Sequence, residues 1–153
     1  MQLNLRVVEA RGIPKNDILS ESDPYCLVQI SGTSDVHKTK IVNNTSSPVF
    51  LQEFKLVIPD VRNSLHLLVR DDDTFSADDS IGKLELIISS IPYDQIIDKW
   101  YPLRPSEGID NAGEIHLVLH LASPNDTPFF SRSQISPGYM GGNMMPPPGA
   151  YPY

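Results

Sequence analysis

Apolar and polar residues alternate at both ends of the first 121 residues. Near the start, Leu3, Leu5 and Val7 are separated by polar residues. Near residue 120 the alternate apolar positions are Ile115, Leu117, Leu119 and Leu121. A period of two is typical of a strand that buries one face. The pattern therefore predicts a half-buried β-strand at each end of this region.

Further short apolar runs lie between these two strands. In sequence letters they are YCLVQI, HKTKIV, FLQEFKLVI, SLHLLV and IGKLELII, with one more strand expected after Trp100. Stretches such as SGTSD, NNTSSP and DDDTFSADDS separate them and are rich in turn-forming residues. The stretch SIPYDQIIDKW is expected to hold a short helix. Eight strands at this spacing predict an all-β fold, an eight-stranded antiparallel β-sandwich.

The composition changes near residue 123. Residues 124–153 contain half of the 14 prolines, and Asp126 and Arg132 are their only charged side chains. A segment of this composition cannot bury a core. We therefore expect a sandwich domain over residues 1–123 and a disordered tail rich in Pro, Gly, Tyr and Met over residues 124–153. Binding of a partner protein and a passive solubilising role both remain open for this tail.

Charge and cysteine content narrow the class of protein. The formal net charge of -7 is unsuited to a nucleic-acid-binding protein, and it would repel an anionic membrane unless it were locally reversed. Cys26 is the only cysteine, so no internal disulfide can form, and the first ten residues lack the continuous apolar core of a signal peptide. These features predict a cytoplasmic protein whose contact with a membrane would be peripheral.

Two stretches of the chain concentrate aspartates. The segment VRDDDTFSADDSIG carries Asp71, Asp72, Asp73, Asp78 and Asp79. The segment NDILSESDPYCLV carries two more, Asp17 and Asp23, six positions apart. Loops of a sandwich gather at its two ends, and Ca²⁺ prefers about 6–8 oxygen ligands. The two loops therefore predict a calcium site, although a simply solvated acidic turn remains the alternative.

These motifs resemble those of the C2 domain, a β-sandwich family that binds phospholipid in a calcium-dependent way. The resemblance covers residues 1 to about 121 and depends on the motifs from Asp17 to Tyr25 and from Asp71 to Gly82. It implies the permuted strand order known as type II topology and a site for two or three Ca²⁺ ions. The implied ligands are the carboxylates of Asp17, Asp23, Asp71, Asp73 and Asp79, with the backbone carbonyls of Asn16 and Asp72. Asp78 matches no ligand position.

The same resemblance implies how membranes are bound. Calcium would reverse the negative charge of the loops, so that anionic, phosphatidylserine-like lipids can approach. Ile18, Leu19 and Phe75 would enter the bilayer interface from the loop tips, and folding back onto neighbouring loops is the alternative. Lys38 and Lys40 are candidate contacts for a lipid headgroup, and a solvated strand edge explains them equally well.

Catalysis has little support in the sequence. Cys26 lies within an apolar run and is expected in the core, while His66, His116 and His120 alternate with apolar residues and are expected on outer faces. We therefore expect a non-enzymatic protein that is recruited to membranes by calcium. The alternative is a calcium-independent scaffold that binds protein partners through its Pro-rich tail.

Overall fold

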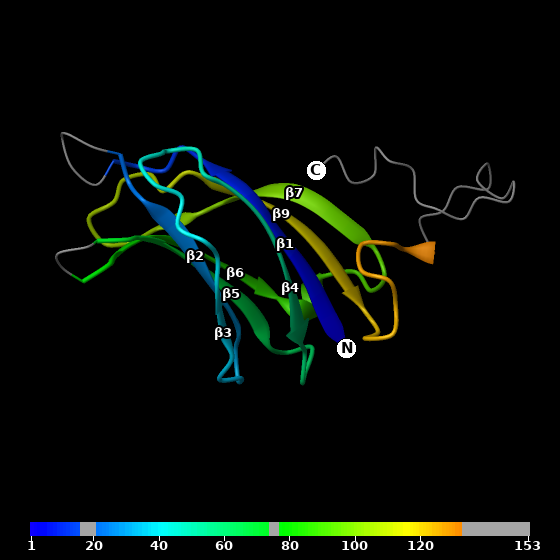
Figure 1. The fold of residues 1–153 in the computed structure, drawn as a ribbon. Coiled ribbons are helices and arrows are strands. Elements are labelled where there is room, and N and C mark those ends of the chain that lie inside the picture. Colours follow the sequence, from blue (N-terminus) through cyan, green and yellow to red (C-terminus); the bar gives the residue numbers. More distant parts are fainter. Residues whose placement is uncertain (16–20, 74–76, 133–153) are drawn as a thin grey trace, which may run out of the picture.

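Two antiparallel sheets pack face to face in this chain (Figure 1). The structure is a computed structural model that describes residues 1–15, 21–73 and 77–132. The first sheet has the order β4 (Val49–Val57), β1 (Gln2–Arg11), β9 (Glu114–Ala122) and β7 (Ile96–Pro102). The second has the order β3 (Val36–Lys38), β2 (Pro24–Ile30), β5 (Ser64–Asp71), β6 (Asp79–Ile87) and β8 (Arg104–Pro105). The predicted all-β sandwich is confirmed.

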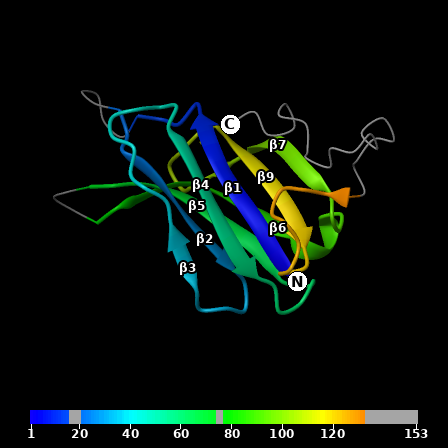
Figure 2. The ribbon, with the colours of Figure 1, turned by 45° about the vertical axis from the view of Figure 1, so that its right-hand side comes forward.

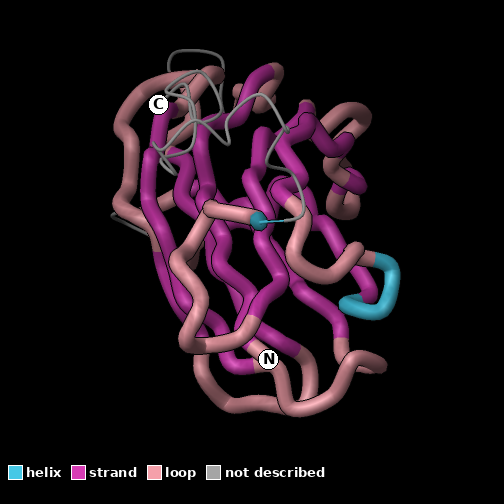
Figure 3. The backbone as a smooth tube through the Cα atoms, turned by 90° about the vertical axis from the view of Figure 1, so that its right-hand side faces the viewer, coloured by secondary structure: helices cyan, strands magenta, loops and turns pink. Residues whose placement is uncertain are grey.

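Alternation along the strands builds the core between the sheets. Leu3, Leu5 and Val7 of β1 are fully buried, and Ile115 and Leu117 of β9 are buried with them. β1 pairs with β9 in the middle of the first sheet (Figure 2), so the first and last strands are neighbours. Loops gather at the two ends of the strands (Figure 3).

Local details differ from the sequence prediction. The described ranges contain nine strands, because the two-residue strand β8 adds to the expected eight, and β3 is shorter than the run HKTKIV. The helix expected in residues 90–100 is wrong: a short 3-10 helix lies earlier, at Ile88–Ser90, and β7 begins at Ile96. Pairing with β9 explains the difference, since it satisfies the backbone of β7 and buries Tyr101. No helix in the described ranges is long and apolar enough to span a membrane.

Residues 123–132, which we call the C-terminal strap, cover the outer face of the first sheet. Phe129 is only 5% exposed and packs in a cluster with Val8 of β1, Val118 of β9 and Ile96 of β7. Val8 points toward this outer face, next to a β-bulge between Val7 and Glu9. Packed structure thus continues nine residues past the predicted boundary at residue 123, while residues 133–153 lie outside the described residues.

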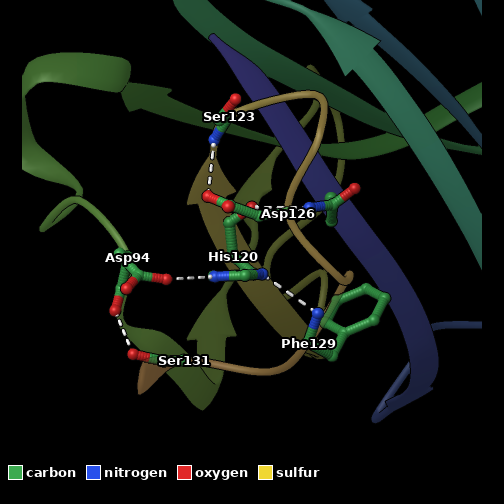
Figure 4. Close-up of polar contacts among 7 residues, drawn as sticks. Asp94, His120, Ser123, Asp126, Phe129 and Ser131 are labelled. Atoms are coloured by element: carbon green, nitrogen blue, oxygen red, sulfur yellow. Dashed lines mark hydrogen bonds and ion pairs between the residues drawn. The ribbon is translucent and has the colours of Figure 1, made fainter. Parts of the chain in front are cut away.

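His120 joins the strap to the sheet (Figure 4). Its side chain has no exposure to solvent, although it lies on the outer face of β9 as predicted, because the strap covers it. His120 Nδ1 accepts a hydrogen bond from the backbone N–H of Phe129 at 3.0 Å, and Nε2 lies 2.9 Å from Oδ1 of Asp94. The Ser131 hydroxyl donates to the Asp94 backbone carbonyl. Both ring nitrogens of a fully buried histidine are therefore paired.

Candidate metal centre

Strand register brings three aspartates to one end of the second sheet. Asp71 ends β5, and it lies opposite both Pro24 at the start of β2 and Asp79 at the start of β6. Asp23 immediately precedes Pro24. Figure 1 shows these strand ends side by side, on the side of the molecule away from the N-terminus. Three of the predicted ligands, from two loops far apart in sequence, are thus neighbours.

Asp71 is the most buried of these carboxylates, at 3% exposure. Its Oδ1 accepts the backbone N–H of Asp23 at 2.8 Å, but its Oδ2 is buried without a hydrogen-bond partner among the described residues. Burial, and then the negative charges of Asp23, Asp79 and Asp73, raise the pKa of Asp71 above its ordinary value. A buried carboxylate oxygen with other carboxylates around it has the donor chemistry that a hard cation such as calcium prefers.

Asp23 is held by two further hydrogen bonds. Its Oδ1 accepts the backbone N–H of Asn44 at 2.6 Å, and its backbone carbonyl accepts the N–H of Asp72 at 3.0 Å. Asn44 has a φ of 54°, a left-handed conformation that asparagine tolerates, and its side chain accepts the N–H of Glu21. The loop between β3 and β4 therefore supports the site. Sequence reasoning missed Asn44 because NNTSSP reads only as a turn.

Asp78, which matches no ligand position, accepts hydrogen bonds from three other residues: Tyr25, Asp73 and Arg70. Its carboxylate accepts the Tyr25 hydroxyl of β2 through Oδ2 and the backbone N–H of Asp73 at 3.0 Å through Oδ1. Its backbone carbonyl accepts Nη2 of Arg70 at 2.9 Å. The Tyr25 bond is the main cause of a lowered pKa of Asp78, and burial with this bond raises the pKa of Tyr25 to about 12. Both oxygens of the Asp78 carboxylate therefore accept hydrogen bonds from the protein.

The complete predicted ligand set is not assembled by the described residues. Within residues 1–15, 21–73 and 77–132, no three His, Cys, Asp or Glu side chains are grouped closely enough to hold a metal ion. Five predicted contacts lie outside the described residues: Asn16, Asp17, Ile18, Leu19 and Phe75. Asp72 and Asp73 are tied by their backbone N–H groups to Asp23 and Asp78 respectively. The structure thus places part of the proposed site and the framework around it.

Comparison with known proteins identifies the family. The sequence model of the C2 domain family matches residues 1–103 of this chain. The chain belongs to the C2 domain family.

Its relatives include large proteins of which it resembles one part. The mouse cytosolic phospholipase A2 delta is 36% identical over 106 residues, which are 68% of this chain and 13% of that protein. Among solved structures, the first C2 domain of plant Extended Synaptotagmin 1 has a TM-score of 0.72 at 21% identity, covering 78% of this chain and 92% of that one. Calcium-bound Extended-Synaptotagmin 2 has a TM-score of 0.67 at 21% identity, covering 78% and 44%. At 21% identity these two structures support the fold only.

Two lysines of this C2 domain were predicted as contacts for a lipid headgroup. Nζ of Lys38 lies 4.3 Å from the centroid of the Tyr25 ring, so Lys38 is beside the pair formed by Tyr25 and Asp78. Lys40 is exposed, and its backbone N–H donates to Oε1 of Gln52 at 2.5 Å. Lys38 therefore places a positive charge beside the pair formed by Tyr25 and Asp78, while the backbone of Lys40 is bonded to β4 of the other sheet.

The cysteine of the C2 domain lies in the core, as expected, and is poorly suited to act as a nucleophile. Cys26 is fully buried in β2, and burial raises the pKa of its thiol, so the reactive thiolate is disfavoured. His116 lies with Nε2 2.5 Å from Oδ1 of Asp98 and stacks on Trp100, with ring centroids 5.1 Å apart. Both residues have structural roles in the sheets that contain them.

Proposed function

We propose that this C2 domain binds anionic phospholipid membranes in a calcium-dependent manner. The observation that carries the proposal is Asp71, a buried carboxylate with one oxygen unpaired among the described residues and other carboxylates around it. Among neighbours of the same fold, calcium-bound Extended-Synaptotagmin 2 shows that this fold can hold calcium. The ligands would be Asp17, Asp23, Asp71, Asp73 and Asp79, with backbone oxygens of Asn16 and Asp72, for two or three Ca²⁺ ions.

The residues at the acidic end would carry a charge switch. In the absence of cations the clustered carboxylates repel anionic headgroups. Bound Ca²⁺ would supply positive charge and coordination positions for phosphate or carboxylate oxygens of lipid. Lys38 and Lys40 would add positive charge beside the loops, and Ile18, Leu19 and Phe75 would anchor the loop tips in the interface.

The proposal includes the remaining properties of the chain. It would act as a non-enzymatic module. The likeness to a phospholipase covers only 13% of that enzyme, so it gives no support to lipid hydrolysis here. The chain is cytoplasmic and moves to phosphatidylserine-like membranes when calcium rises. Binding of a partner protein through residues 124–153 remains the alternative.

Liposome co-sedimentation tests the proposal. The full chain is mixed with phosphatidylserine-containing vesicles over a calcium titration, with a chelator and with phosphatidylcholine vesicles as controls. We expect sedimentation only with calcium and anionic lipid, at free calcium on the order of 10⁻⁶ to 10⁻⁴ M. Asp71→Asn should raise the calcium concentration needed for half-maximal sedimentation about 100-fold or more. Loss of a group that only hydrogen-bonds a metal ligand already weakens metal binding about 10–100-fold, and loss of the ligand itself should cost at least as much.

Asp60→Asn is the matched control. Asp60 is an aspartate in the turn before β5, at the end of that strand opposite Asp71, and it pairs with Arg62 at 2.7 Å. Its variant has the same change of charge and should sediment as the wild type does. Equal sedimentation of Asp71→Asn and wild type would refute the calcium site. Binding to a protein partner that persists in chelator and depends on residues 124–153 would favour the scaffold alternative.

A further inference from the structure

Asp78 joins both arms of the acidic loop to the sandwich. The outgoing arm is bound through the N–H of Asp73, which donates to Oδ1 of Asp78. The returning arm contains Asp78 itself, and the next residue, Asp79, begins β6. Oδ2 of Asp78 accepts the hydroxyl of Tyr25 on β2, two strands away from β6 in the second sheet. One side chain therefore fixes two arms of a loop to a third element.

Tyr25 gives this connection a rigid base. It is 3% exposed, and in the ladder between β2 and β5 it lies opposite Arg70. Arg70 in turn donates from Nη2 to the backbone carbonyl of Asp78 at 2.9 Å. The Tyr25 ring is covered from β3 by Lys38, whose Nζ lies 4.3 Å from the ring centroid. Residues of three strands, β2, β5 and β3, thus contact the pair formed by Tyr25 and Asp78.

The contacts of Asp78 explain why an aspartate occupies a position without a ligand role. Both of its carboxylate oxygens accept hydrogen bonds from the protein, one from an amide and one from a hydroxyl. Hydrogen bonds to an ionised acceptor are stronger than those between neutral groups, so a carboxylate holds the arms more firmly than an amide would. The acidic stretch therefore contains aspartates of two kinds, with different tasks.

We propose that Tyr25 and Asp78 form a clamp that sets the positions of Asp73 and Asp79 before calcium binds. The calcium part of this inference depends on the proposed function. Tyr25 and Asp78 are positioning residues: Asp78 accepts the backbone N–H of Asp73, and the Tyr25 hydroxyl holds the Asp78 carboxylate. A preset loop loses less conformational freedom on binding, so the clamp raises calcium affinity without adding a ligand.

Removal of one hydroxyl tests the clamp. In Tyr25→Phe the ring that packs under Lys38 remains, and only the bond to Asp78 is lost. Tyr101→Phe is the matched control, because Tyr101 is also buried and has a lysine amine, Nζ of Lys99, 5.2 Å from its ring centroid, but lies in the first sheet. Amide hydrogen exchange by NMR in calcium-free protein should be faster at Asp73 in Tyr25→Phe and unchanged in Tyr101→Phe.

Calorimetric calcium titration without lipid provides the second measurement. Tyr25→Phe should weaken calcium binding by about fivefold or more, a typical lower bound for coupling between sites, with the number of ions unchanged. Asp78→Ala should weaken it at least as much. The double variant should be no weaker than Asp78→Ala alone, because the two side chains act as one unit. Asp78→Glu, which keeps the carboxylate, should recover part of the affinity.

The outcomes separate this inference from the proposed function. A wild type that binds calcium while Tyr25→Phe binds it equally well would overturn the clamp and leave the proposed function standing. A wild type that binds no calcium would overturn the proposed function together with the calcium part of the clamp. Equal amide exchange at Asp73 in wild type and Tyr25→Phe would overturn the clamp itself.

Discussion

Asp71 at the acidic end and His120 under the C-terminal strap are both buried polar side chains, and they are paired differently. His120 has a partner at each ring nitrogen, the Phe129 amide and the Asp94 carboxylate. Asp71 has one oxygen bonded to the Asp23 amide and the other unpaired among the described residues. A buried polar group that the protein satisfies completely holds the fold together.

A buried polar group that is only half satisfied has a different meaning. Carboxylates of Asp23, Asp79 and Asp73 contribute to the raised pKa of Asp71, so its surroundings disfavour its charge. Such an arrangement costs stability and is retained where a ligand uses it. Pairing, rather than burial or residue type, therefore distinguishes the candidate site from the structural histidine. Changes to the strap, to His120 and to Asp71 test this distinction, in order of decreasing effect on stability.

Removing the strap should have the largest effect on stability. A chain ending at residue 123 lacks Phe129, exposes Val8 and Val118, and leaves His120 without its amide partner. We expect its free energy of unfolding to fall by about 3 kcal/mol, from one lost aromatic side chain and one unsatisfied polar group. Urea unfolding measures it, with a chain ending at residue 132 as the control. Equal stability of the two truncated chains would contradict the structural role of the strap.

Replacing the histidine alone should have an intermediate effect. His120→Phe keeps a ring in the buried position but leaves the Phe129 amide unpaired, and should cost about 2 kcal/mol of unfolding free energy. His66→Phe is the control, since the His66 side chain is 53% exposed and lies 3.8 Å from Glu85. Its effect should stay within about 0.5 kcal/mol. A similar loss from both variants would show that His120 contributes no more than a surface residue.

The smallest effect should have the opposite sign. Asp71→Asn removes a charge that burial and neighbouring carboxylates disfavour, so calcium-free protein should gain about 0.5–2 kcal/mol of unfolding free energy. Because the pKa of Asp71 is higher in the folded protein than in the unfolded chain, its ionisation lowers the free energy of unfolding. This loss is complete above the folded-state pKa and disappears below the unfolded-state pKa. The gain should therefore be largest near neutral pH and shrink in acid. Thermal unfolding with chelator over a pH series measures it, and a loss of stability at neutral pH would contradict the assignment.

Much of the fold could be predicted because strand periodicity is a local property. Alternation at Leu3, Leu5 and Val7 is visible in the sequence, and burial of all three follows from it. The helix expected in residues 90–100 failed because Ile96 and Ile97 pair with a strand about twenty residues later, a contact that local propensity does not contain. Likewise, Asp78 reads as one more acidic residue until its bond to Tyr25, 53 positions earlier, is known.

The strap could not be predicted from composition. Residues 124–132 share the Pro-rich character of residues 133–153, and only the adjacent Phe129 and Phe130 hint at burial. The decisive partner, His120, lies in a strand whose alternation predicts an outward side chain. The side chain does point outward from the sheet, but it is buried because the C-terminal strap covers this face.

Residue type and spacing along the chain were enough to establish the two-layer β architecture and the concentration of aspartates in two loops, since both are local properties of the sequence. The pairing of buried polar groups was settled by the folded molecule: Asp78 is satisfied by Tyr25, His120 by the strap, and Asp71 only in part among the described residues. The physical reason is that hydrogen bonding and desolvation depend on neighbours brought together by strand register and layer packing, whatever their separation in sequence.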